Sequence, residues 1–124
     1  MAIKLTQGDT RPRIVLVLAD EITNAPINLV GATVKMRFKE VGSATSKETL
    51  TGGLLAGKVL SDGSIDVNPP YDTAGAGGRC YIDWGITTLD TAGEFEGEIE
   101  VTFSDSKIQT VYDVIEFTVR EQFV

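Results

Sequence analysis

Four carboxylates on alternating positions are the residues of this sequence that most suggest chemistry. The stretch "GEFEGEIEV" holds Glu94, Glu96, Glu98 and Glu100. Residues i and i+2 of a strand lie about 6.8 Å apart on one face, which overlaps the ~6.5–9.5 Å between the carboxylates of an inverting glycosidase. Such a pair needs a cleft and one carboxyl with a raised pKa, whereas carboxylates along the polar face of a strand are solvated. We therefore interpret this row as the outer face of a strand.

A matching row of cations occurs earlier, in the stretch "ATVKMRFKE". There, Lys35, Arg37 and Lys39 alternate with apolar residues. Like charges on one strand favour an oppositely charged neighbour, and each cross-strand pair contributes roughly 0.2–1 kcal/mol. Two alternatives follow: the two strands are neighbours in one sheet, or the acidic row meets a basic partner protein. Both rows are therefore candidates for partner contact.

Other residue types that support catalysis are scarce. The chain has no histidine and a single cysteine, Cys80. This composition excludes a cysteine–histidine nucleophile, a histidine base for the serines, an intrachain disulfide and a thiolate zinc site. A phosphate-binding loop of the GxxxxGK type is also missing. We predict that the protein is not an enzyme and uses no cofactor or metal.

Two further patterns admit a binding hypothesis. "SDGSIDVN" alternates Asp62, Ser64, Asp66 and Asn68, which suggests calcium, but it lacks the glycine and terminal glutamate spacing of an EF-hand loop. We interpret it as an Asp62-Gly63 turn that leads into a strand. The sole tryptophan, Trp84, is in phase with Ile82 in "RCYIDWG", so we expect a core residue beside Cys80 and not a sugar-stacking platform.

The composition is that of a soluble, single-domain protein. A chain of 124 residues corresponds to one domain, spanning residues 1–124. Its 18 acidic and 11 basic side chains give a net charge of −7, which disfavours binding to nucleic acid or to an anionic membrane. The longest apolar run, "IVLVLA", is shorter than the ~20 residues that span a bilayer. "MAIKLTQGDT" does not resemble a signal peptide, so we expect synthesis in the cytoplasm.

Apolar residues recur with a period of two along most of the chain, and no window shows a helical repeat. Strands are expected at residues 2–6, 12–20, 32–40, 79–85, 93–103 and 108–121, with a turn at 104–107. Gly97 takes an inward position of its strand. The segment 12–20 is apolar on both sides, so we expect it to be covered on both faces. A change of phase after Ile108 predicts a bulge or bend near Tyr112 and Asp113.

The middle of the chain, residues 41–78, holds most of the glycines. It contains short strand candidates in "ETLTG" and "SIDVN", and composition alone predicts that "TAGAGG" is a mobile loop. With seven or so short strands separated by turns, the sequence predicts an antiparallel β-sandwich carrying a long glycine-rich loop or hairpin at 41–78.

Four segments then occur in a recognisable order: "QGDT", "NLVGATVKMRF", "YIDWG" and "DTAGEFEGEIEVTFSDSKIQTV". Together they resemble the N-terminal immunoglobulin-like domain of the phage baseplate upper protein family, across residues 3–121. The resemblance implies an immunoglobulin-like sandwich of seven to nine strands. It also implies a component of the phage particle, in the baseplate, tail, neck or capsid.

The chain departs from the family pattern at three places. The turn reads "SDSK" where the family has "xDGK", the segment 41–78 is longer than the family's hairpin, and the chain stops at Val124. We therefore expect the domain to stand alone. Gly31 and Gly93 fall at strand entries and predict a positive φ or close backbone approach. Asp9 and Asp90 are expected to cap turns.

We thus predict a structural protein of the virion that contacts other virion proteins and forms a homo-oligomer or ring. The N-terminal strand, the segment 41–78 and the tail residues Phe123 and Val124 are further candidates for contact, with fraying as the alternative for the tail. The alternative function is an immunoglobulin-like carbohydrate-binding or cell-surface adhesion module. Contact with a host glycan belongs to this second interpretation.

Overall fold

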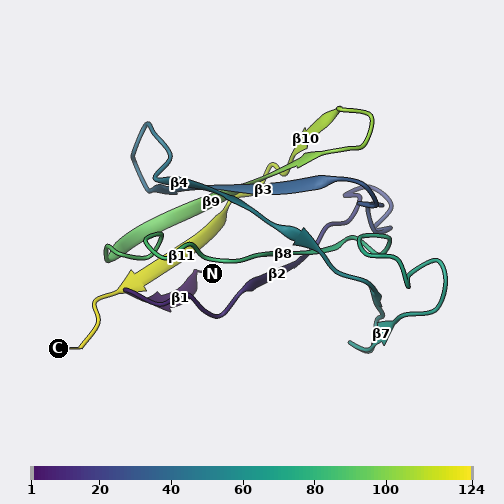
Figure 1. The fold of residues 1–124 in the computed structure, drawn as a ribbon, viewed down its shortest axis with the longest axis horizontal. Helices are drawn as coiled ribbons and strands as arrows, with labels where there is room; N and C mark the ends of the chain where they lie inside the picture. The colour runs from purple at the N-terminus through teal and green to yellow at the C-terminus, as the bar shows by residue number, and fades with distance from the viewer. Residues whose placement is uncertain (1, 124) are drawn as a thin grey trace.

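The computed structural model describes residues 2–123 and is built of strands (Figure 1). Within this range the chain forms eleven strands and no helix. The strands are β1 (Ile3–Thr6), β2 (Ile14–Val17), β3 (Thr33–Glu40), β4 (Glu48–Thr51), β5 (Gly53–Leu54), β6 (Lys58–Val59), β7 (Ile65–Asp66), β8 (Arg79–Ile82), β9 (Gly93–Thr102), β10 (Ile108–Thr110) and β11 (Ile115–Arg120). The number exceeds the predicted seven to nine because three of the strands have only two residues each.

The strands form two main sheets and a small hairpin. The first sheet has the order β1-β11-β9-β3-β4, with β10 also paired to β9, and the second has the order β2-β8-β5. The hairpin consists of β6 and β7. Among the strand pairs, β1–β11 is parallel and the others are antiparallel, so the predicted antiparallel pairing is wrong for the N-terminal strand.

Side chains from both sheets form one core, as expected of the predicted all-β sandwich. The central inward positions of β3 and β9 are buried, and Gly97 takes one of them. A Cβ at Gly97 would lie 2.5 Å from the sulfur of Met36 and 3.1 Å from the ring of Phe117. Glycine is therefore required there because the facing side chains fill the space.

An aromatic cluster lies at the centre of this core. The Phe38 ring stacks on Phe95 at 4.8 Å between centroids and meets the edges of Trp84 and Phe117 at 5.3 and 5.6 Å. The indole Nε1 of Trp84 donates to the Pro12 carbonyl at 2.9 Å. Offset-stacked and edge-to-face pairs are the favoured aromatic geometries. The prediction that Trp84 is a core residue is confirmed.

The strand that returns after the turn at 104–107 is interrupted by a bend, as predicted. β10 pairs with Glu100–Thr102 of β9, β11 pairs with Gly93–Gly97, and the backbone bends at Tyr112 and Asp113. The bend holds extra residues on one strand only, which is the defining feature of a bulge. The three residues of β10 are exposed, whereas Phe117 and Val119 of β11 are buried in the core.

The turn itself contains a strained residue. Ser106 has a φ of +71°, a conformation that suits glycine better than serine. Replacing Ser106 by glycine should therefore raise the free energy of unfolding by about 1 kcal/mol. Urea denaturation would show this as a higher midpoint with an unchanged slope, whereas a lower midpoint would contradict the assignment of strain.

The glycine-rich segment at 73–78 differs from the mobile loop predicted by composition. Gly75, Gly77 and Gly78 are buried, and a Cβ on any of them would collide with backbone of Leu29, Gly57 or Leu18. Backbone hydrogen bonds join Leu29 N–H to Gly75 O and Leu18 N–H to Gly78 O, both at 2.8 Å. These glycines are present because backbone packs on backbone, which composition alone does not reveal.

The prediction that residues 12–20 are covered on both faces is also wrong. Ile14 and Leu18 are buried, but Val15 and Val17 on the outer face of β2 are 49% and 48% exposed. Beside them, the guanidinium of Arg13 lies 3.8 Å from the centre of the Tyr81 ring on the neighbouring strand β8. The outer face of the second sheet therefore presents valine side chains to solvent.

Candidate functional site

The two charged rows lie side by side in the first sheet. β3 and β9 are antiparallel, and their register places Lys35 opposite Glu100, Arg37 opposite Glu98, and Lys39 opposite Glu96. The hypothesis that the two strands are neighbours is confirmed. In the following, these six residues are called the charge ladder.

Ion pairs connect the two sides of the charge ladder. The Arg37 guanidinium donates to Glu100 at 2.7 Å and lies 3.9 Å from Glu98, and the Lys39 ammonium lies 3.2 Å from Glu96. The hydrogen bond from Arg37 lowers the pKa of Glu100 and raises the pKa of Arg37. The fourth glutamate, Glu94, accepts a hydrogen bond from Thr118 of β11 at 2.8 Å.

The charge ladder stabilises the ionised form of a carboxylate. A general acid needs a carboxyl whose pKa is raised, commonly by burial in an apolar pocket. Glu100 is shifted in the opposite direction because a cation bonds to its charged form. The geometry therefore supports a structural role for the ladder, and its use in partner contact stays a prediction.

Reversing one charge of the ladder should destabilise the protein. In Arg37→Glu, three carboxylates face one another across β3 and β9, so we expect a lower melting temperature, with a larger effect at low salt than at high salt. The double variant Arg37→Glu/Glu100→Arg restores the pair between these two positions but leaves like charges opposite Glu98 and Lys35, so it should recover only part of the loss. Lys107→Glu, which changes the net charge equally outside the ladder, is the control. Equal melting temperatures for Arg37→Glu and Lys107→Glu would contradict the pairing.

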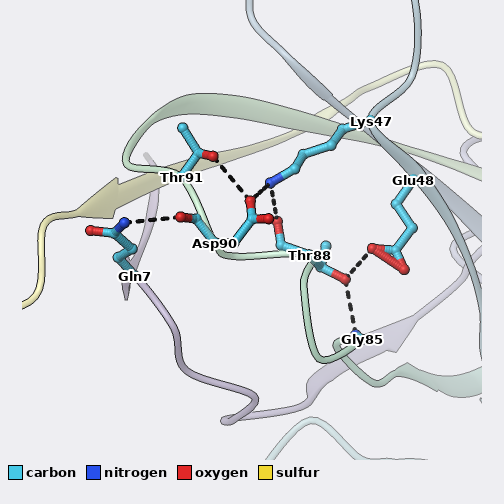
Figure 2. A network of polar contacts seen from close by, with 7 residues as sticks. All are labelled: Gln7, Lys47, Glu48, Gly85, Thr88, Asp90 and Thr91. Carbon is cyan, nitrogen blue, oxygen red and sulfur yellow. Dashed lines mark hydrogen bonds and ion pairs between the residues drawn. The ribbon is translucent and has the colours of Figure 1, made fainter.

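A second group of polar contacts gathers at one end of the first sheet (Figure 2). The Lys47 ammonium forms an ion pair with the Asp90 carboxylate and donates to the Thr88 carbonyl at 2.9 Å. Thr91 donates to the same carboxylate at 3.0 Å, and Gln7 donates to the Asp90 carbonyl at 2.9 Å. The Lys47 hydrogen bond lowers the pKa of Asp90.

This network corrects the expected role of Asp90 as a turn cap. Its carboxylate accepts from two side chains, and the Lys47 partner is 43 positions away in sequence. The turn at Asp9 is closed by a backbone hydrogen bond, from its own N–H to the Thr6 carbonyl at 3.2 Å. Gly31 and Gly93 have positive φ values of +77° and +147°, as predicted.

Thr88, which the sequence did not single out, is the buried member of the network. Its hydroxyl donates to Glu48 at 2.5 Å and accepts from the Gly85 N–H at 3.0 Å, with no exposed surface (Figure 2). A hydroxyl beside a carboxylate is the arrangement of a nucleophile and its base. A substrate could not reach the buried Thr88 hydroxyl, so the hydrogen bond between Thr88 and Glu48 instead connects β4 to the loop 85–90.

The remaining candidates occupy structural positions. Asp62 accepts hydrogen bonds from the Ser64 N–H at 2.9 Å and hydroxyl at 2.6 Å, as expected of the predicted turn before β7. Cys80 is buried, which raises the pKa of its thiol to about 11. In the range 2–123, no group of three or more metal-ligating side chains lies close enough to hold an ion.

The tail candidates divide between described and undescribed residues. Phe123 is 89% exposed, and the Arg120 guanidinium lies 4.9 Å from its ring centre. Val124 lies outside the described residues. Docking of this tail on a partner therefore stays a prediction.

Comparison with known proteins adds no assignment. No protein-family model, curated protein or solved structure matches the chain. Across residues 2–123, no helix has the length and apolarity that crossing a bilayer requires.

Proposed function

We propose that this chain is a non-enzymatic structural component of a phage particle, in the baseplate, tail, neck or capsid, and that it acts through contacts with other particle proteins. The observation that carries the proposal is a contact between two of the sequence segments on which the family resemblance rests. Gln7 of "QGDT" donates to the carbonyl of Asp90 in "DTAG" at 2.9 Å, and the Gly8 N–H donates to Leu89 at 2.8 Å. The two segments thus act together in one fold.

The strand order supports the immunoglobulin-like part of the proposal. The second sheet, β2-β8-β5, corresponds to strands B, E and D of an immunoglobulin domain. The run β11-β9-β3-β4 of the first sheet corresponds to strands G, F, C and C′, which is the division found in variable-type domains. In such sandwiches, function resides in loops and edges.

The surface supports a role in assembly. Several large apolar side chains are more than four-fifths exposed, namely Ile22, Ile86, Tyr112 and Phe123. Two of them, Ile22 and Tyr112, line one groove, and apolar side chains gathered on one surface are typical of sites that another protein covers. Particle assemblies are symmetric, so a homo-oligomer or ring is the arrangement we propose.

A genetic experiment tests this role. Deleting the coding sequence in the phage that carries it should yield particles that lack a defined part in electron micrographs, and a wild-type copy supplied in trans should restore them. Complete particles at normal yield without this chain would contradict the proposal. Normal particles that fail to adsorb would instead favour the adhesion alternative.

A further inference from the structure

A groove of about 910 Å³ lies between two segments that are distant in sequence. One wall is the hairpin 18–27 that follows β2, and the other is β10 with the bend after it. Val101 of β9, which belongs to the core, also lines the groove. The groove therefore opens where the two sheets separate, and β10 lies at the end of the molecule opposite to the C-terminus (Figure 1).

Both walls carry apolar side chains that nothing in the described chain covers. Ile22 on the hairpin is 94% exposed, and Tyr112 on the facing wall is 96% exposed. These are the highest values among the large apolar side chains of residues 2–123. An isolated chain gains nothing from displaying them, whereas a bound segment would bury both.

Among the described residues β10 pairs only with β9, so its other backbone edge is unpaired, and Gln109 and Thr110 of this strand line the groove. Phe103 N–H donates to Lys107, and Val111 N–H donates to Ile99, so the hydrogen-bonded positions of this ladder are the odd-numbered ones. Because bonded and non-bonded pairs alternate in an antiparallel ladder, the backbone groups of Ile108 and Thr110 point away from β9. Such an edge can accept an additional strand.

The charge of the groove selects the partner. Among the described residues that line it, the charged ones are Asp20, Glu21 and Asp113, and none is a lysine or an arginine. Backbone N–H groups of Thr23 and Ile22 bond to Asp20 and lower its pKa, which keeps it ionised. Pairing two copies through this groove would bring six carboxylates together, so electrostatics disfavours a second copy and favours a cationic segment.

We propose that this groove binds an extended segment of another protein, which adds a strand to β10, buries apolar side chains against Ile22 and Tyr112, and places lysine or arginine near Asp20 and Asp113. The inference deepens the proposed assembly role and rests on it for the source of the segment. The groove would recognise this segment by backbone hydrogen bonds to the added strand and by attraction between opposite charges.

The test uses short fluorescent peptides in which valine, isoleucine or threonine alternates with lysine, and fluorescence anisotropy with the full chain. We expect saturable binding that weakens with salt, and binding at least tenfold weaker when glutamate replaces lysine in the peptide. Thr110→Pro removes only an outward N–H and should abolish binding, whereas Thr110→Val should retain it. Asp113→Lys should weaken binding at least tenfold, and Val15→Ala, at an exposed apolar residue outside the groove lining, should leave it unchanged.

Several outcomes would overturn the proposal. These are the absence of binding by every lysine peptide, equal binding by Thr110→Pro and Thr110→Val, and self-association of the chain that Thr110→Pro abolishes, which would make a second copy the occupant. The proposed function has a separate readout. Peptide binding by a chain that is absent from particles overturns the virion role alone, and a particle component that binds no peptide overturns the groove alone.

Discussion

Replacing Phe38 by alanine lowers the free energy of unfolding by about 3–5 kcal/mol. Phe38 has no exposed surface and contacts three other aromatic rings at centroid distances between 4.8 and 5.6 Å. The loss combines burial, the cavity left behind and the aromatic pairs, which add about 0.5–1.5 kcal/mol each. Because a small domain is stable by only about 5–15 kcal/mol, this variant is near the limit of folding.

Urea denaturation followed by tryptophan fluorescence measures this loss, since Trp84 belongs to the same cluster. Phe123→Ala is the matched control, because it makes the same chemical change at a side chain that is 89% exposed, and its effect should stay within about 0.5 kcal/mol. If Phe38→Ala does not fold, Phe38→Leu keeps most of the apolar volume and should show an intermediate loss. Equal stability of Phe38→Ala and Phe123→Ala would contradict the assigned core.

Gly78→Ala has the second largest expected effect, a loss of about 2–4 kcal/mol. Gly78 has a φ of +77°, and a Cβ there would collide with the Leu18 carbonyl oxygen and lie 3.2 Å from the Ile27 carbonyl oxygen. Leu18 and Ile27 flank the hairpin of the groove, and Ile27 N–H donates to Leu18 O at 2.9 Å. The collision is with backbone, so no side-chain rotation relieves it.

Gly42→Ala separates the two contributions to this loss. Gly42 has a similar φ of +89°, and no atom lies within 4 Å of the position that the alanine methyl group would take. It should therefore show the conformational cost alone, about 1 kcal/mol. Thermal and urea denaturation of both variants give the difference, which is the cost of the collision. Equal losses for the two variants would mean that the glycine-rich segment is not packed as described.

The strands could be predicted where local pattern and long-range pairing agree. In β3, β8 and β9 a strict period of two leaves one possible inward face, and the opposite charges of Arg37 and Glu98 indicated which strands are neighbours. In each of these cases the local sequence carries the structural signal.

The parts that sequence reasoning missed depend on contacts between distant residues. The Lys47–Asp90 pair and the buried Thr88 hydroxyl join segments about 40 positions apart, and no local spacing indicates them. Composition alone could not reveal that Gly75 and Gly78 are packed, because glycine is common both in mobile loops and in close backbone contacts. The groove could not be predicted from the sequence for the same reason, since its two walls come together only in the folded chain.

Mass spectrometry of density-purified phage particles, with heads and tails separated, tests the proposed role most directly. Recovery of this chain at a fixed copy number in one fraction is the expected result, and it would also place the protein on the particle. Its absence from every particle fraction, while it is abundant in the infected cell, would contradict the structural role and favour an assembly factor or an exported binding module.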